Sequence, residues 1–166
     1  MTLPKAWMSW STGKDSAWAL HTIRKQQEIE VVALLTTVNA SAARVAMHAV
    51  RLSLVDAQAA ALGLPVVAVS IPLPCPNSAY ERGMEDAMNR AHAERVTHMV
   101  LVICSWRMSA GIGGAAKISI TPLFPLWGLD TRGLACEMVE SGLRAYVTCV
   151  DPKKLDRSFA GRLFEP

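Results

Sequence analysis

Runs of apolar residues alternate with helix-like stretches along the whole of this 166-residue chain. The predicted strands are Lys5–Trp10, Glu30–Thr36, Val66–Ile71, His98–Cys104 and Ala145–Val150. The predicted helices are 15–27, 46–62, 78–94 and 131–141. The second strand run is apolar at consecutive positions, which is typical of a parallel strand buried on both faces. The alternation therefore predicts an α/β fold of three layers, with helices covering both faces of a five-stranded, mostly parallel sheet.

Local signals refine two of these helices. The helix at 46–62 is expected to end at Gly63, and five apolar residues share its predicted inner face: Met47, Val50, Leu54, Ala57 and Ala61. Ser78 and Glu81 have the spacing of a capping box at the start of the next helix. Its predicted inner face is formed by Tyr80, Met84, Ala87 and Ala91.

Composition sets limits on the class of protein. Hydrophobic residues make up 51% of the chain and charged residues 19%, a balance that fits one globular domain spanning 1–166. No apolar run is long enough to cross a bilayer and no signal peptide is evident, so the expected compartment is the cytoplasm. The net charge of +3 comes from scattered basic residues, which does not favour a nucleic-acid partner. The four cysteines form no close pair, so no metal site is predicted among the side chains.

A polar hexapeptide, Ser11-Thr12-Gly13-Lys14-Asp15-Ser16, stands directly between the first predicted strand and the first predicted helix. Gly13 would let the backbone turn tightly and approach an anion, and Lys14 supplies a positive charge. The start of a helix presents free N–H groups to the same place. Ser11 and Ser16 add hydroxyls, and Asp15 would hold the loop or a magnesium ion. Because parallel sheets bind ligands beyond the carboxyl ends of their strands, the hexapeptide predicts a phosphate-binding turn.

The hexapeptide has two other interpretations. A capped helix start with a nearby lysine would use the same residue types, although all six in this order after a buried strand is less expected by chance. A Walker-type phosphate loop is excluded, because Lys14 is followed by Asp15 rather than by serine or threonine, and residue 8 is methionine rather than glycine.

The hexapeptide resembles the Ser-Gly-Gly-Lys-Asp-Ser signature of the PP-loop ATP pyrophosphatase superfamily, with Thr12 as the departure. Further blocks are similar to the diphthine–ammonia ligase (diphthamide synthase) branch, which is adenine nucleotide alpha hydrolase-like. These blocks are Ser9-Trp10-Ser11, Met47-His48-Ala49-Val50-Arg51, Gln58 with Ala61–Pro65, Pro122–Gly128 with Asp130-Thr131, Cys149-Val150-Asp151 and Phe159–Arg162. The resemblance implies a Rossmann-like, HUP-type domain that binds ATP through Ser11, Thr12, Gly13, Lys14, Asp15 and Ser16.

The resemblance also implies a chemistry. A carboxylate acceptor of unknown identity attacks the α-phosphate of ATP, pyrophosphate leaves, and ammonia displaces AMP to give an amide. Lys14 and Asp15 would be the catalytic residues, with Mg²⁺ carried by ATP. The alternative is a nucleotide-binding domain with little or no catalysis, a degenerate paralogue. A third reading, an RNA-modifying PP-loop enzyme, lacks the paired cysteines and the basic, aromatic surface that it would need.

Four residues outside the hexapeptide are candidate contacts for substrate or nucleotide. His48 and Arg51 lie one turn apart on the predicted 46–62 helix, where they could bind ATP or the acceptor, or simply lie at the surface. Trp127 and Asp130 could line the crevice, or pack and cap the helix that starts at Thr131.

Two segments depart from the family pattern. Residues 101–118 lack the family's Gly-Asp pair and acidic, arginine-rich segment. Codons can be chosen for 101–113 that, read two bases later, encode Gly-Asp-Leu-Phe-Leu-Glu-Asp-Val-Arg-Arg-Tyr-Arg. We therefore hypothesise an out-of-frame reading of the family's block, which the gene's own codons would test. The chain also stops at Pro166, before a Glu-Asn-Gly-Glu type element, and is expected to be truncated relative to the family.

Overall fold

The structure is a computed structural model, and it describes residues 2–39, 41–46, 49–102 and 120–165. The hypothesis of a shifted reading frame falls largely on residues outside these ranges. Contacts between residues divide the chain into two compact units, Met1–Trp127 and Gly128–Pro166. The expectation of a single domain over 1–166 stays a prediction, and the two units are described separately below.

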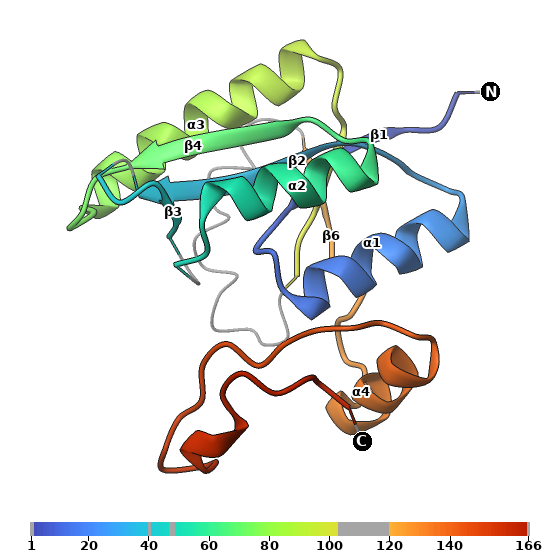
Figure 1. Cartoon of the computed structure of the whole chain (residues 1–166). Helices are drawn as coiled ribbons and strands as arrows, with labels where there is room; N and C mark the ends of the chain where they lie inside the picture. The colour runs from blue at the N-terminus through green and yellow to red at the C-terminus, as the bar shows by residue number, and fades with distance from the viewer. Residues whose placement is uncertain (1, 40, 47–48, 103–119, 166) are drawn as a thin grey trace. The chain divides into compact units, whose positions relative to one another are not determined.

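The first unit contains a six-stranded sheet (Figure 1). Its strands are β1 (Lys5–Ser9), β2 (Glu30–Asn39), β3 (Arg44–Val45), β4 (Val66–Ile71), β5 (His98–Val100) and β6 (Thr121–Leu123). The parallel strands lie in the order β4, β2, β1, β5, β6. The short β3 pairs with the last residues of β2 in the antiparallel direction, on the side away from β4. This arrangement confirms the predicted α/β class with a mostly parallel sheet.

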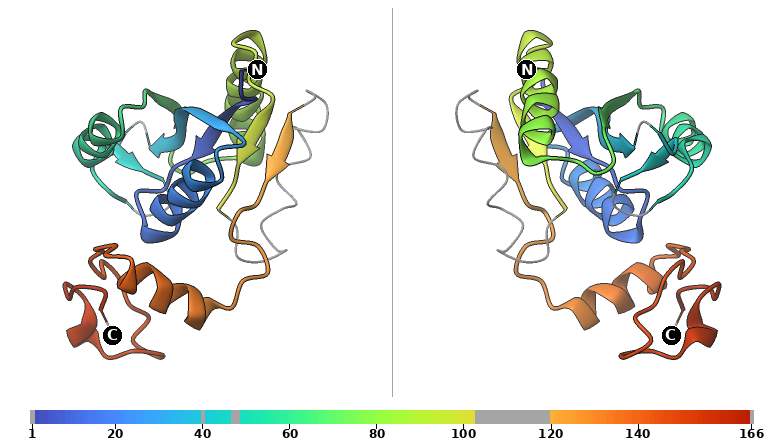
Figure 2. Two further views of the ribbon diagram at one scale, coloured as in Figure 1. Left: turned by 90° about the vertical axis from the view of Figure 1, so that its right-hand side faces the viewer. Right: turned by 90° about the vertical axis from the view of Figure 1, so that its left-hand side faces the viewer.

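Three helices cover the sheet: α1 (Lys14–Gln26), α2 (Leu52–Leu62) and α3 (Asn77–Ala93). Figures 1 and 2 show α1 and α2 on one face and α3 on the other. The direction of the crossovers explains this. The connections from β1 to β2 and from β2 to β4 move one way across the sheet, and the connection from β4 to β5 moves back. Since such connections are right-handed, α3 lies on the opposite face from α1 and α2.

The core is formed where the central strands meet the helices. On the α3 face, Trp7, Leu35 and Val69 pack in one buried cluster with Ala87 and Ala91 of α3. Met8 and Leu34, which alternate with these residues along β1 and β2, are also fully buried. Burial of both faces of β1 and β2 agrees with their continuous apolar sequence. These two buried strands position the loop that follows β1, in which the candidate site lies.

The second helix differs from its prediction. It begins at Leu52 rather than at residue 46, because Val45 pairs with Val38 in β3 and Ala49 and Arg51 have non-helical backbone. The predicted inner face is wrong in the described residues: Leu54, Ala57 and Ala61 are exposed, and α2 buries Val55 and Ala59 instead. The stop at Gly63 is confirmed, with a backbone φ of 68° and capping bonds to Ala59 and Ala60.

Two further predictions for this unit need correction. The capping box is wrong, because α3 begins at Asn77 after Pro76 and has no side-chain cap. Met84, Ala87 and Ala91 face inward as predicted, but Tyr80 is exposed. The strand at 121–123 was not predicted. Pro122 argues against a strand in general but is tolerated at a sheet edge such as this one.

The second unit contains α4 (Thr131–Glu140) and a 3-10 helix, η2 (Arg157–Phe159). The fifth predicted strand, Ala145–Val150, does not join the sheet. Its described backbone instead forms an isolated antiparallel bridge between Tyr146 and Leu163, with Val147 and Gly161 bonded alongside. Among the described helices of the chain, none has the length and hydrophobicity that crossing a membrane would require.

Candidate functional site: the loop between β1 and α1

The loop that follows β1 lies where the strand order reverses. Strand β1 has β2 on one side and β5 on the other, and the connections from β1 and from β4 leave in opposite directions. The N–H of Trp10 donates to the carbonyl of Leu35 at 2.8 Å, so pairing with β2 continues one residue past the end of β1. The next residues, 11–13, connect to α1. They stand at the carboxyl end of β1, the usual position of a ligand in an open parallel sheet.

The tight turn in this loop is made at Thr12, not at Gly13. Thr12 has a φ of 67°, a left-handed conformation that a β-branched residue rarely adopts. Gly13 has a φ of −87° and ψ of 168°, which is ordinary extended backbone. A Cβ atom on Gly13 would lie 3.5 Å from the Ser11 hydroxyl oxygen, an ordinary contact. The expected turning role of Gly13 is therefore wrong, and its role in letting an anion approach stays a prediction.

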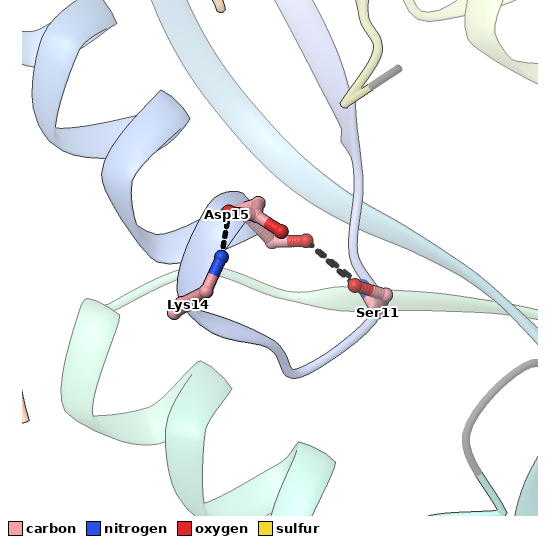
Figure 3. A network of polar contacts seen from close by, with 4 residues as sticks. Ser11, Lys14 and Asp15 are labelled. Carbon is pink, nitrogen blue, oxygen red and sulfur yellow. Dashed lines mark hydrogen bonds and ion pairs between the residues drawn. The ribbon is translucent and has the colours of Figure 1, made fainter. Parts of the chain in front are cut away.

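The two serines of the hexapeptide close the loop on itself. The N–H of Ser11 donates to Ser16 Oγ at 3.2 Å, and the two hydroxyl oxygens lie 2.9 Å apart. Ser16 is fully buried, whereas Ser11 is half-buried. Figure 3 shows Ser11 facing the first turn of α1 across the loop. The buried hydroxyl thus fixes the spacing between the end of β1 and the start of α1.

The first turn of α1 leaves several donors available. No side chain caps this helix, and in the described part of the chain the N–H groups of Thr12, Gly13, Asp15 and Ser16 have no acceptor. Ala17 is the first residue whose N–H enters the helical pattern, by donating to the Gly13 carbonyl at 3.2 Å. Unsatisfied N–H groups and the positive end of the helix dipole favour an anion at this position.

Lys14 and Asp15 form an ion pair at the mouth of the loop. Lys14 Nζ lies 2.5 Å from Asp15 Oδ1, and both side chains are about one-third exposed, at 34% and 37% (Figure 3). Both charges therefore stand at the surface of the loop, beside the free N–H groups. A site with one ammonium group, one carboxylate and several oriented N–H donors can hold a polyphosphate together with a cation.

Two side chains outside the hexapeptide contact the loop, and the sequence assigned no role to either. Gln58 of α2 accepts a hydrogen bond from Trp10 Nε1 at 2.9 Å and donates one to the Thr12 carbonyl at 3.3 Å. The available signal was weak: both residues lie in blocks that resemble the family, and Gln58 is a single polar residue in the apolar stretch from Ala57 to Leu62. Its orientation toward the loop depends on the packing of α2, which the sequence did not predict correctly.

The other predicted contacts are placed as follows. Arg51 precedes α2 in extended backbone, so its expected position on a helix flank is wrong. His48 lies outside the described residues. Trp127 is 45% exposed, with its ring centroid 6.1 Å from that of Phe124. Asp130 caps α4, because its Oδ2 accepts a hydrogen bond from the N–H of Gly133 at 2.6 Å. In the described residues no three His, Cys, Asp or Glu side chains are grouped as metal ligands.

Comparison with known proteins shows the family of this chain. Nine chains of solved structures match. One is the crystal structure described as a predicted subunit of tRNA methyltransferase from Methanocaldococcus jannaschii, with a TM-score of 0.55 and 14% identity over 90% of this chain and 81% of that one. At that identity the likeness shows a shared fold. A search of curated proteins found no match. The family model of the diphthamide synthase N-terminal domain matches residues 4–102, which include β1, the loop and α1. The chain therefore belongs to the diphthamide synthase family of the PP-loop superfamily, whose members typically use ATP.

Proposed function

We propose that this chain binds magnesium–ATP at the β1–α1 loop and uses it to form an amide from a carboxylate and ammonia. The observation that carries the proposal is the set of unsatisfied N–H groups at the start of α1, beside Lys14 at the carboxyl end of β1. A triphosphate matches this site, because N–H donors and an ammonium group bind phosphate oxygens through charge-assisted hydrogen bonds. Membership of an ATP-using family agrees with the proposal.

The proposed reaction has two balanced steps. An acceptor carboxylate oxygen attacks the α-phosphorus of ATP, and the bond to the pyrophosphate oxygen breaks, which gives an acyl-adenylate and pyrophosphate. Ammonia then attacks the acyl carbon, AMP leaves with the electrons of the acyl–oxygen bond, and a proton is released to solvent. The loop acts in the first step, since negative charge increases on the leaving pyrophosphate as the bond breaks.

Each loop residue has a proposed part in that step. Lys14 and the N–H groups of the turn hold the β- and γ-phosphates, and Ser11 and Ser16 keep the turn in shape through their shared hydrogen bonds. Asp15 is the carboxylate of the loop that could hold Mg²⁺. When bound, Mg²⁺ would neutralise part of the phosphate charge. Arg51, Trp127 and Asp130, with His48, remain candidates for contacts with the acceptor or the nucleotide.

A thermal-shift titration with magnesium–ATP, with AMP as the comparison, tests the binding part. We expect a saturable rise in Tm with ATP, because a ligand that binds only the folded state stabilises it. Lys14→Ala should weaken the apparent affinity about 10-fold or more, as is typical for loss of a charge-assisted hydrogen bond. Lys25→Ala, which removes an exposed lysine from the other end of α1, is the matched control and should respond like the parent chain.

Pyrophosphate release tests the catalytic part. Amide formation requires that release of pyrophosphate depend on a carboxylate acceptor, and that AMP and an amide accumulate only when ammonium is added. Saturable ATP binding without release across a panel of carboxylates would instead favour the non-catalytic nucleotide-binding domain. Equal stabilisation of the parent chain and Lys14→Ala by ATP would contradict the assignment of the loop.

A further inference from the structure

The side chain of Gln58 bridges α2 to the β1–α1 loop. Its Oε1 accepts from Trp10 Nε1 at 2.9 Å, and its Nε2 donates to the Thr12 carbonyl at 3.3 Å. These partners stand on the two sides of Ser11 in the sequence, so one amide group brackets the start of the loop. Gln58 is half-buried and Trp10 is 4% exposed, which shields the first of these hydrogen bonds from water.

The chemistry of the two partners fixes the orientation of the amide. An indole N–H can only donate a hydrogen bond and a backbone carbonyl can only accept one. The amide oxygen of Gln58 must therefore face Trp10, and its NH₂ group must face Thr12. A glutamine satisfies both partners at once, whereas a glutamate lacks the donor and a methionine lacks both groups.

The hydrogen bond from Gln58 to Thr12 supports the strained residue of the loop. Thr12 is in the left-handed region, a conformation that persists in non-glycine residues only when neighbouring contacts enforce it. Its carbonyl accepts a hydrogen bond from Gln58. The N–H of Ser16, four residues further along the chain, has no acceptor in the described residues. The bridge thus supports the backbone turn that presents these N–H groups to a ligand.

We infer that Gln58 is a positioning residue for the phosphate turn: through its bridge to Trp10 and Thr12 it holds the N–H groups of residues 12–16 ready for an anion. This inference rests on the proposed function for its ligand, although its effect on the turn is independent of any ligand. The packing of α2 itself depends on Val55 and Ala59, which are buried, so removal of the bridge should leave the helix in place.

The test compares Gln58→Met with Gln26→Met, the same change at an exposed position in the last turn of α1. Calorimetric titration with magnesium–ATP should show binding about 5- to 10-fold weaker for Gln58→Met, and unchanged for Gln26→Met. Gln58→Glu keeps the size and the acceptor for Trp10 but loses the donor for Thr12, so it should also bind more weakly. A merely structural bridge would lower Tm but leave the dissociation constant of ATP unchanged, and that result would overturn the inference.

Amide hydrogen exchange in the ligand-free protein provides the second readout. The amides of Ser11 and Ala17, whose N–H groups are hydrogen-bonded on either side of the turn, should exchange faster in Gln58→Met than in the parent chain, while those of β2 stay protected. If the parent chain itself does not bind ATP, the proposed function fails, and exchange alone then decides the role of Gln58. Unchanged exchange at Ser11 and Ala17 would overturn the inference, and selective acceleration there would support it.

Discussion

The two compact units of this chain are stabilised in different ways. In the first, β1 and β2 are covered on both sides, and side chains such as Trp7, Met8 and Leu34 are completely buried. In the second, Leu134 and Met138 are the buried hydrophobic residues among those described. A unit of about 40 residues rarely forms a sufficient core unaided. We therefore expect the sheet to resist unfolding more than the second unit, whose structure depends more on turns and helix caps.

The units also differ in where they place backbone strain. In the described part of the second unit, each residue with positive φ is a glycine: Gly128, Gly142 and Gly161. The first unit has non-glycine residues in this region, among them Thr12 in the candidate site. Strain of this kind costs about 1–3 kcal/mol per residue and is characteristic of functional sites. The unit with the stronger core therefore carries the strained loop.

The largest expected effect comes from removing a buried side chain from each unit. Leu34→Ala should lower the free energy of unfolding by about 2–5 kcal/mol, because it leaves a cavity in the central strand β2. Met138→Ala, at an equally buried position in α4, should accelerate amide exchange only within 128–165. Urea denaturation with amide exchange measures both. Equal loss of global stability in the two variants would contradict the difference between the two units.

The next effect concerns backbone strain. Thr12→Gly should raise the stability of the first unit by about 1 kcal/mol, since glycine adopts positive φ without the clash of a Cβ. Gly142→Ala should lower stability by a similar amount of about 1 kcal/mol, because it introduces that clash in the second unit. Thermal unfolding of the two variants gives opposite shifts in Tm. A loss of stability in Thr12→Gly larger than about 1 kcal/mol, the entropic cost of a glycine in the unfolded chain, would contradict strain at this turn.

A smaller, local effect is expected at the start of α4. Asp130→Ala removes the acceptor for the Gly133 N–H and should cost about 1 kcal/mol or less, as for other helix N-caps. Asp130→Asn keeps an acceptor and should retain the stability of α4. Asp56→Ala, at an exposed position within α2, is the control in the first unit. Amide exchange in α4 measures the effect. Equally fast exchange in Asp130→Asn and Asp130→Ala would contradict the capping role of Asp130.

The smallest effect is electrostatic. Hydrogen bonds from Ser158, first from its side chain and then from its backbone N–H, hold the pKa of Asp156 below its usual value. A lowered pKa stabilises the folded unit at pH values above the ordinary aspartate range, and this contribution is lost as pH falls through the lowered pKa. Carbon-13 NMR titration of the carboxyl group measures it. Ser158→Ala should raise that pKa, and an unchanged value would contradict the assignment.

The sequence predicted best the elements whose signals are local and redundant. Glu30–Thr36 lies within β2, and its consecutive apolar residues are typical of a strand buried on both faces. Val66–Ile71 coincides with β4, an edge strand whose residues alternate between buried and more exposed positions. Gly63 ends α2 because its left-handed backbone is encoded by the residue itself. The position of the loop followed from the same logic, since a polar turn between a buried parallel strand and the next helix lies at the carboxyl end of that strand.

The errors occurred where distant residues decide the outcome. Val45 has helix-compatible neighbours, but its pairing with Val38 of β2 places it in a strand. Ala145–Val150 is rich in β-branched residues, yet it does not join the sheet. The backbone of Val147 is instead hydrogen-bonded to Gly161 and Arg162. At the site, the positive φ at Thr12 and the bridge from Gln58 depend on tertiary contacts between α2 and the loop. Neither can be inferred from one sequence.

The ion pair between Lys14 and Asp15 has a consequence for selectivity. Asp15 acts as a resident counter-ion, so any incoming anion must compete with it for the lysine. Simple oxyanions such as sulfate or free phosphate offer the displaced carboxylate nothing in return. A nucleotide that arrives complexed with a divalent cation brings a new partner for the carboxylate as it takes over the lysine. The loop is therefore expected to discriminate against the abundant free anions of the cell before any contact with the adenosine is made.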